Sequence, residues 1–128
     1  MKEIRFAWFC HNKHFDEISR VELTDMMLID GSRPSWITSD NCEVIAKVLS
    51  IGQTDHSGKE IFEGDIVTAT FDLRYTFGEG TYQVELLDGA FQFLNIHDST
   101  DGYQWMELIP ETVKVIGNIY ENPELLTQ

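Results

Sequence analysis

The clearest pattern along the chain is an alternation of apolar and polar residues in two segments, 81–87 and 90–96, separated by Asp88-Gly89. The alternating apolar positions are Tyr82, Val84, Leu86, Phe91 and Phe93. A period of two places such residues on one face of a strand. Asp-Gly suits a tight turn whose two central residues both have positive φ. The pattern therefore predicts a β-hairpin over residues 81–96.

Apolar alternation and β-branched runs predict further strands at residues 2–9, 44–51, 66–68 and 113–119. Residues 15–30 fit either a helix or strands, and we favour strands with a turn at residues 30–32. Segments rich in turn-forming residues predict loops at 34–41, 72–80 and 97–104. Residues 122–126 are predicted to form a short helical turn.

Short strands with turn signals between them favour an all-β, mainly antiparallel fold, either a barrel or a sandwich. We expect a small SH3-like barrel with an N-terminal extension and a short C-terminal helical turn. In domain terms, residues 1–43 form the extension packed on the barrel, and residues 44–128 form the barrel domain. A chain of 128 residues, 42% of them hydrophobic, is long enough to fill such a core.

Two segments, 58–67 and 115–126, combine turn residues with strand residues. In the first, glycine supplies backbone freedom, and Asp65 is expected to accept hydrogen bonds from backbone N–H groups of the turn. In the second, Asn122 can cap a helical turn that Pro123 opens. The structural positions predicted in the two segments are Gly58, Gly64, Asp65, Gly117, Asn118, Asn122 and Pro123.

These two segments read GKEIFEGDIV and VIGNIYENPELL, and together they resemble the YopX family of phage and prophage proteins. The opening, MKEIRF, resembles the start of that family more loosely. Before Gly58 the chain keeps the glycine and the aspartate of the family pattern and lacks its tyrosine. The resemblance supports the SH3-like barrel and implies a location in the host cytoplasm. It brings no active site, because the family has no established biochemical activity.

The net charge of −13 is unevenly distributed. Residues 1–59 hold nine acidic and seven basic residues, whereas residues 60–128 hold thirteen acidic residues and two basic ones, Arg74 and Lys114. Phosphate binding needs clustered cations, so direct binding of nucleic acid or of an anionic membrane is disfavoured. Basic protein partners and divalent cations remain open. No apolar run has the length of a membrane span.

Three groups of residues invite a chemical role. Cys10, His11 or His14, with Cys42 or His97, could ligate zinc. Structural zinc sites commonly use two closely spaced pairs of ligands, and the sequence offers one imperfect pair and no second pair. We therefore favour a polar turn after a strand, and cysteine thiols that form no disulfide. A cysteine nucleophile would need an orienting group that the sequence does not supply. The carboxylates Glu60, Glu63 and Asp65 could bind Ca²⁺ or act as a general acid and base. We favour the simpler interpretation, in which Glu60 and Glu63 are solvated and Asp65 stabilises the turn. We therefore expect no metal, no cofactor and no enzymatic activity.

The sequence favours a non-enzymatic protein-binding or regulatory module that docks on a host or phage protein. The candidate contact residues are Trp36, Tyr103, Trp105, Leu125 and Leu126. Each aromatic could instead close the core, and the two leucines could pack on the chain itself or on a second copy. Alternatives are an acidic DNA mimic that inhibits a nucleic-acid-binding protein and a self-assembling structural protein, for which a homo-oligomer is expected.

Overall fold

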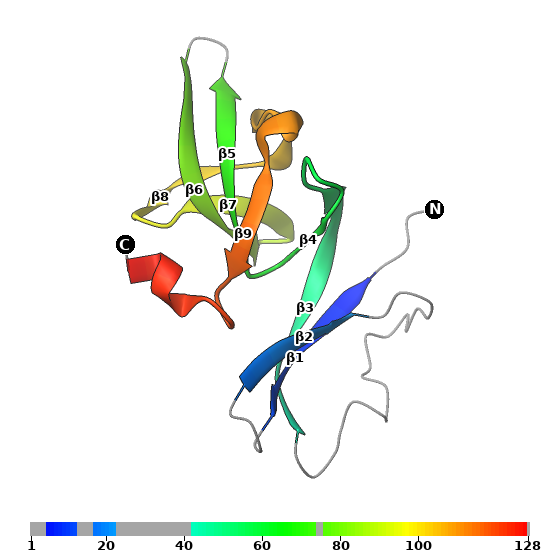
Figure 1. Cartoon of the computed structure of the whole chain (residues 1–128). Coiled ribbons are helices and arrows are strands. Elements are labelled where there is room, and N and C mark those ends of the chain that lie inside the picture. The colour runs from blue at the N-terminus through cyan, green and yellow to red at the C-terminus, as the bar shows by residue number, and fades with distance from the viewer. Residues whose placement is uncertain (1–4, 13–16, 23–41, 74–75, 128) are drawn as a thin grey trace.

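The computed structural model describes residues 5–12, 17–22, 42–73 and 76–127, which form two antiparallel sheets (Figure 1). The four-stranded sheet has the order β2-β1-β3-β4. Its strands are β1 (Phe6–Asn12), β2 (Glu17–Glu22), β3 (Cys42–Thr54) and β4 (Glu60–Phe62). The five-stranded sheet has the order β8-β7-β6-β5-β9. Its strands are β5 (Asp65–Leu73), β6 (Thr76–Leu87), β7 (Ala90–Asn95), β8 (Asp98–Tyr103) and β9 (Lys114–Asn118).

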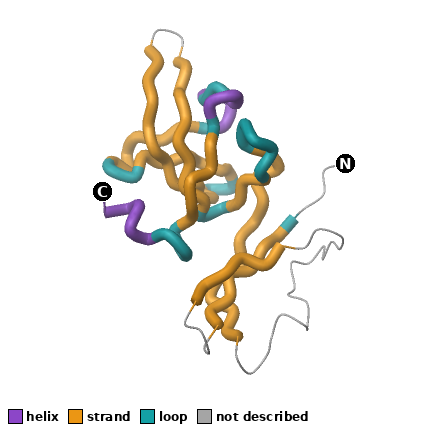
Figure 2. Tube along the Cα trace, viewed as in Figure 1, coloured by secondary structure: helices purple, strands orange, loops and turns teal. Residues whose placement is uncertain are grey.

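The helical segments of the described residues are short 3-10 turns, coloured purple in Figure 2. They are η2 (Trp105–Glu107), η3 (Pro110–Thr112) and η4 (Pro123–Thr127). None of these segments is long and apolar enough to cross a membrane. The fold is therefore all-β and antiparallel, as the sequence predicts, and η4 confirms the C-terminal helical turn.

The five-stranded sheet curls into a half-barrel around the main core. Strands β5 to β8 follow one another as neighbours, and β9 returns to pair with β5. The inward positions of these strands and of their connections form the core, which contains Ile61, Val67, Ala69, Tyr82, Val84, Phe93, Leu108 and Val113. Ile61 belongs to β4, so the four-stranded sheet contributes to the core of the half-barrel.

A second core lies on the four-stranded sheet and contains Ala7, Phe9, Val48 and Phe62. Tyr120, which follows β9, packs against this core, with its ring centroid 4.3 Å from that of Phe9. The C-terminal segment of the half-barrel therefore covers part of the N-terminal sheet.

The predicted hairpin is confirmed as β6 and β7. Leu87 pairs with Ala90, and the turn residues Asp88 and Gly89 have φ angles of 51° and 82°. Both angles are positive, as a type I′ turn requires. Tyr82 lies on the inner face, and it is buried as the alternation predicts.

The predicted loops at 72–80 and 97–104 are wrong over residues 72–73, 76–80 and 98–103, while residues 74 and 75 lie outside the described part. Antiparallel pairing of β5 with β6 continues to Leu73↔Thr76, and residues 98–103 form β8. Small and polar residues are tolerated in β6 because the hydrogen bonds between strands come from the backbone. They are tolerated in β8 because it is an edge strand, which is paired on one side only. At Gly78 the missing side chain leaves room for the Phe71 ring, which a Cβ would approach to 3.0 Å.

Strand β1 includes Cys10, His11 and Asn12. The polar turn predicted after residue 9 is therefore wrong for these three residues. Strand β2 confirms strands over residues 17–22, whereas the predicted turn at 30–32 and loop at 34–41 lie outside the described residues. The predicted domain boundary between residues 43 and 44 falls within β3, which pairs with β1. The division into two domains stays a prediction.

Candidate functional site

The turn after β3 is built around the carboxylate of Asp55, which is 6% exposed. It accepts hydrogen bonds from the backbone N–H of Ser57 at 2.9 Å, of Lys59 at 2.9 Å and of Val115 at 3.0 Å, and from the Ser57 hydroxyl at 2.8 Å. Burial alone would raise the pKa of Asp55, but these hydrogen bonds outweigh it and lower the pKa to about 2. Because Val115 belongs to β9, the carboxylate joins the turn to the closing strand. Gly58, with φ of 88°, completes the turn.

Gly64 and Asp65 connect the two sheets. Asp65 is fully buried and accepts a hydrogen bond from the Phe62 N–H at 2.9 Å, which confirms its predicted role in the turn. Its other carboxylate oxygen lies 3.1 Å from the guanidinium of Arg20 in β2. Gly64 has φ of 89°, and a Cβ there would lie 3.0 Å from the Tyr120 ring. The ion pair and the close approach both hold the half-barrel against the N-terminal sheet.

The C-terminal segment is held by two asparagines. Asn118 is buried, and its side-chain oxygen accepts hydrogen bonds from the N–H groups of Tyr120 at 3.1 Å and Glu121 at 2.7 Å. The side-chain oxygen of Asn122 in turn accepts the Asn118 N–H at 3.2 Å. A Cβ at Gly117 would lie 2.6 Å from that oxygen, so glycine is needed for the approach. These contacts fold the chain back after β9.

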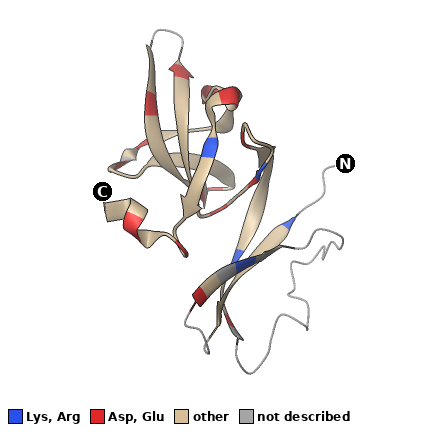
Figure 3. Cartoon of the chain, in the orientation of Figure 1, with Lys and Arg blue, Asp and Glu red and all other residues tan. Residues whose placement is uncertain are grey.

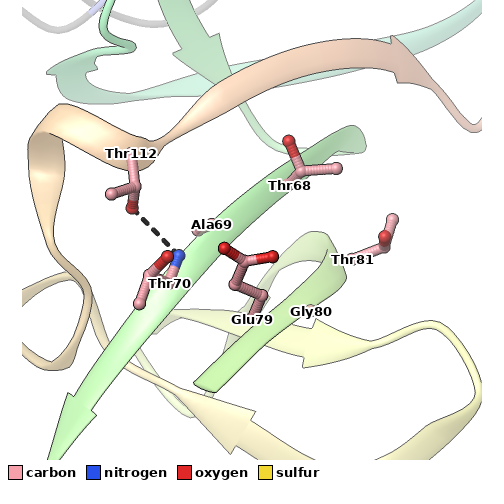
Figure 4. Close-up of a pocket in the computed structure, with 7 residues that line it drawn as sticks. All are labelled: Thr68, Ala69, Thr70, Glu79, Gly80, Thr81 and Thr112. Atoms are coloured by element: carbon pink, nitrogen blue, oxygen red, sulfur yellow. Dashed lines mark hydrogen bonds between the residues drawn. The ribbon is translucent and has the colours of Figure 1, made fainter. Parts of the chain in front are cut away.

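The outward face of the half-barrel carries three shallow hollows. Figure 4 shows the first, of about 370 Å³, on the outer side of β5 and β6. It is lined by Thr68, Ala69, Thr70, Glu79, Gly80, Thr81 and Thr112. The Thr70 N–H donates to the Thr112 hydroxyl at 2.9 Å, which fixes η3 against β5. This hollow offers hydroxyl groups and one carboxylate.

The second hollow, of about 300 Å³, lies between β6 and the segments that precede β5 and follow β9. Its lining is Glu63, Gly64, Gln83, Val84, Glu85, Leu86, Leu87, Ile119 and Tyr120. The third, of about 460 Å³, lies over β7 and β8 and shares Leu87 with the second. The second and third hollows therefore form a continuous uneven surface along β6 and β7.

Within the described ranges, no three His, Cys, Asp or Glu side chains gather closely enough to hold a metal ion. Cys10 is a buried thiol that packs beside Trp8, while His14 and the Cys42 side chain lie outside the described part. Glu60 is half-buried and pairs with Arg5 at 3.2 Å, so the prediction of a solvated Glu60 is wrong.

The family model described as "YopX protein" matches residues 7–127 of the chain. The chain belongs to the YopX family. No curated protein matches it.

Two solved structures resemble this YopX-family chain. Protein EF1440 from Enterococcus faecalis is 22% identical, with 98% of this chain and 99% of that chain covered and a TM-score of 0.54. Protein yopX from Bacillus subtilis is 21% identical, with 94% and 95% covered and a TM-score of 0.49. At this identity the likeness to EF1440 concerns the fold.

The YopX-family chain places the predicted contact residues in different surroundings. Tyr103 stacks on Phe71 with ring centroids 4.7 Å apart, and Trp105 lies 6.0 Å from Phe93, so both pack against the main core while half-buried. Leu125 and Leu126 are half-buried in η4, which Pro123 opens. Trp36 lies outside the described residues. A role of these residues in binding stays a prediction.

Sequence reasoning did not single out Asp55, Arg20 or Tyr120 as positions that hold the YopX fold together. Asp55 carried a usable signal, because an aspartate two residues before a serine or glycine favours a side-chain turn. Arg20 had none, since its partner Asp65 lies 45 residues away in the sequence. Tyr120 lies within the family motif, but only the fold shows that its ring packs on Phe9.

Proposed function

We propose that this YopX-family chain is a non-enzymatic, phage- or prophage-encoded module that docks on a host or phage protein in the host cytoplasm. The observation that carries the proposal is the exposed surface of the half-barrel. Phe77 in β6 and Met106 in η2 are 80% and 84% exposed, and the three hollows lie on the outward side of the same sheet. Aromatic side chains and methionine are enriched in protein interfaces.

The engagement of two buried carboxylates supports the same proposal. Asp55 and Asp65 are buried and hold turns, and neither carboxylate faces one of the three hollows. Such groups contribute to folding and leave recognition to the surface. The chain's binding would then depend on shape and charge complementarity.

We further propose that the half-barrel is the SH3-like barrel predicted from the sequence. Support comes from the meander of β5 to β8, the return of β9 beside β5, and the 3-10 turn η3 directly before β9. Folds of this type host many unrelated functions, so the proposal concerns architecture.

The two alternatives find less support. Figure 3 shows the acidic positions spread over both sheets and their connections, whereas a DNA mimic requires carboxylates in a row. Self-assembly would need a self-complementary face. Light scattering tests it, because a monomer at micromolar concentration would exclude a stable homo-oligomer.

The proposal is tested by capture from host lysate with tagged wild-type protein and two variants. Phe77→Ser removes the exposed aromatic of the half-barrel. Ile45→Ser is the matched control, because Ile45 is 43% exposed and lies on β3 of the other sheet. We expect one protein that wild type and Ile45→Ser retain and that Phe77→Ser loses. Retention of nothing at low salt would contradict the proposal.

A further inference from the structure

The second hollow has the features of a site for a particular kind of side chain. It is bounded by Glu63 in the turn before β5, by Glu85 and Leu87 of β6, and by Ile119 and Tyr120 after β9. Three segments far apart in the sequence thus meet around it. Its volume of about 300 Å³ lies at the lower end of small-molecule sites, which suits one or two side chains of a larger partner.

The walls of this hollow are held by backbone hydrogen bonds. The Gly64 N–H donates to the Val84 carbonyl at 2.8 Å, and the Ile119 N–H donates to the Gly64 carbonyl at 2.9 Å. On the far side, the Tyr120 ring packs on Phe9. A site formed before binding loses less conformational entropy when it is occupied.

The charge of the hollow favours a cation. Glu63 and Glu85 both line it, and within the described ranges no lysine or arginine pairs with either. The Gln83 side-chain amide donates to the Glu85 carboxylate at 2.9 Å and so orients it. Burial, and then the charge of Glu63, raise the pKa of Tyr120, so its hydroxyl stays protonated. The net charge of −13 adds a long-range attraction for basic partners.

The hollow also offers apolar surface beside its carboxylates. Leu86 and Leu87 are 38% and 43% exposed, and both line it. Leu87 extends this surface into the third hollow, next to Ala90 and Leu94. A ligand that satisfies both features carries a basic side chain next to an apolar one.

We infer that this hollow, the β6 acidic hollow, binds an extended peptide segment of a protein partner in which lysine or arginine alternates with aliphatic residues. The basic side chain lies between Glu63 and Glu85, and its aliphatic neighbour packs on Leu87. The inference rests on the proposed function and names the chemistry of the partner. Phosphate-bearing ligands are disfavoured, because both carboxylates would repel them.

Binding of two fluorescein-labelled peptides to the full chain tests the inference. The first is Gly-Ser-Lys-Leu-Arg-Val-Ser-Gly, and the second has glutamate in place of both basic residues. We expect the double variant Glu63→Gln/Glu85→Gln to bind the basic peptide at least about tenfold more weakly than wild type. Leu87→Ser should weaken it as well, and the acidic peptide should not bind.

The matched control is Glu43→Gln/Glu124→Gln, which removes the same charge outside all three hollows. It should bind the basic peptide within about twofold of wild type, since distant surface charges are screened by salt. An equal loss in both double variants would mean attraction by net charge alone and would overturn the inference. So would the absence of binding by a wild-type protein that still captures a host protein, a result that leaves the proposed function standing. Equal urea midpoints for the two double variants would show that folding is not the cause of a difference.

Discussion

Replacing Asp55 by asparagine isolates the contribution of one buried carboxylate to the stability of the fold. The side chain keeps its shape, but it loses the charge that four hydrogen bonds stabilise. Asparagine also has an NH2 group in place of one carboxylate oxygen. Either the Val115 N–H or one of the other donors is therefore left without an acceptor. We expect a loss in the free energy of unfolding that has a pH-dependent and a pH-independent part.

The size of the pH-dependent part follows from the pKa. The folded-state pKa of Asp55 is about 2, against an ordinary value of 3.8. One pKa unit corresponds to about 1.4 kcal/mol, so the charged form contributes about 2 kcal/mol at pH 7. Because the folded-state pKa is lowered, this contribution is complete above about pH 4 and is lost as the pH falls through 2. The unmatched donor adds about 1 kcal/mol at every pH.

Urea unfolding of wild type and Asp55→Asn between pH 7 and pH 2 measures both parts. The difference in free energy between the two proteins should shrink by about 2 kcal/mol over this range, since other carboxylates titrate in both proteins and cancel. Asp88→Asn in the exposed hairpin turn is the control and should change stability by less than about 0.5 kcal/mol. A difference between wild type and Asp55→Asn that stays constant down to pH 2 would refute the reasoning.

Three further predictions concern the junction between the sheets, and urea unfolding measures each. Gly58→Ala should lower the free energy of unfolding by about 1 kcal/mol because of backbone strain. Gly64→Ala should lower it by at least about 1 kcal/mol more, because its Cβ also displaces Tyr120. Equal losses in the two variants would contradict this. Gly117→Ala should cost about 2 kcal/mol and expose residues 122–127 to hydrogen exchange, so unchanged protection would count against it. Arg20→Met should cost about 3 kcal/mol by leaving Asp65 without this ion pair. Adding Asp65→Asn should restore part of that loss, whereas additive losses would contradict the coupling.

The sequence predicts best where local geometry decides the structure. The β6–β7 hairpin follows from the alternation on both sides of Asp88-Gly89, because the turn and the apolar face agree. The predicted role of Asp65 in a turn is confirmed, because the hydrogen bond that its carboxylate accepts comes from Phe62, only three positions away. These features need no knowledge of distant parts of the chain.

The sequence fails where pairing across the sheet overrides local composition. The segment 76–80 contains glycine and polar residues that are typical of loops, yet it continues β6 because β5 offers a complete partner strand. Strand β8 is similarly polar and pairs with β7 as an edge strand. Backbone hydrogen bonds to a neighbouring strand do not depend on side-chain polarity, so no local pattern records them.

The candidate surface could be predicted only in part. The excess of acidic residues after residue 59 leaves basic partners and divalent cations open, and the β6 acidic hollow contains two of those carboxylates. Its position could not be predicted, because Glu63, Glu85 and Tyr120 come together only through the pairing of β5 with β6 and β9. The aromatic residues that composition suggested as contacts, Tyr103 and Trp105, pack against the core instead of standing free.

The arrangement also explains why the family resemblance identifies a fold and leaves the partner open. The motif residues Asp65 and Asn118 are buried, and Gly64 and Gly117 allow close approaches that a Cβ would prevent. Substitution at such positions changes stability, so they report on how the two sheets are joined. The outward positions of β6, among them Glu79 and Glu85, carry none of these constraints, because their side chains face the hollows. Under the proposed function, partner choice would therefore vary on that face while the junction stays the same, and a relative with the same fold need not bind the same protein.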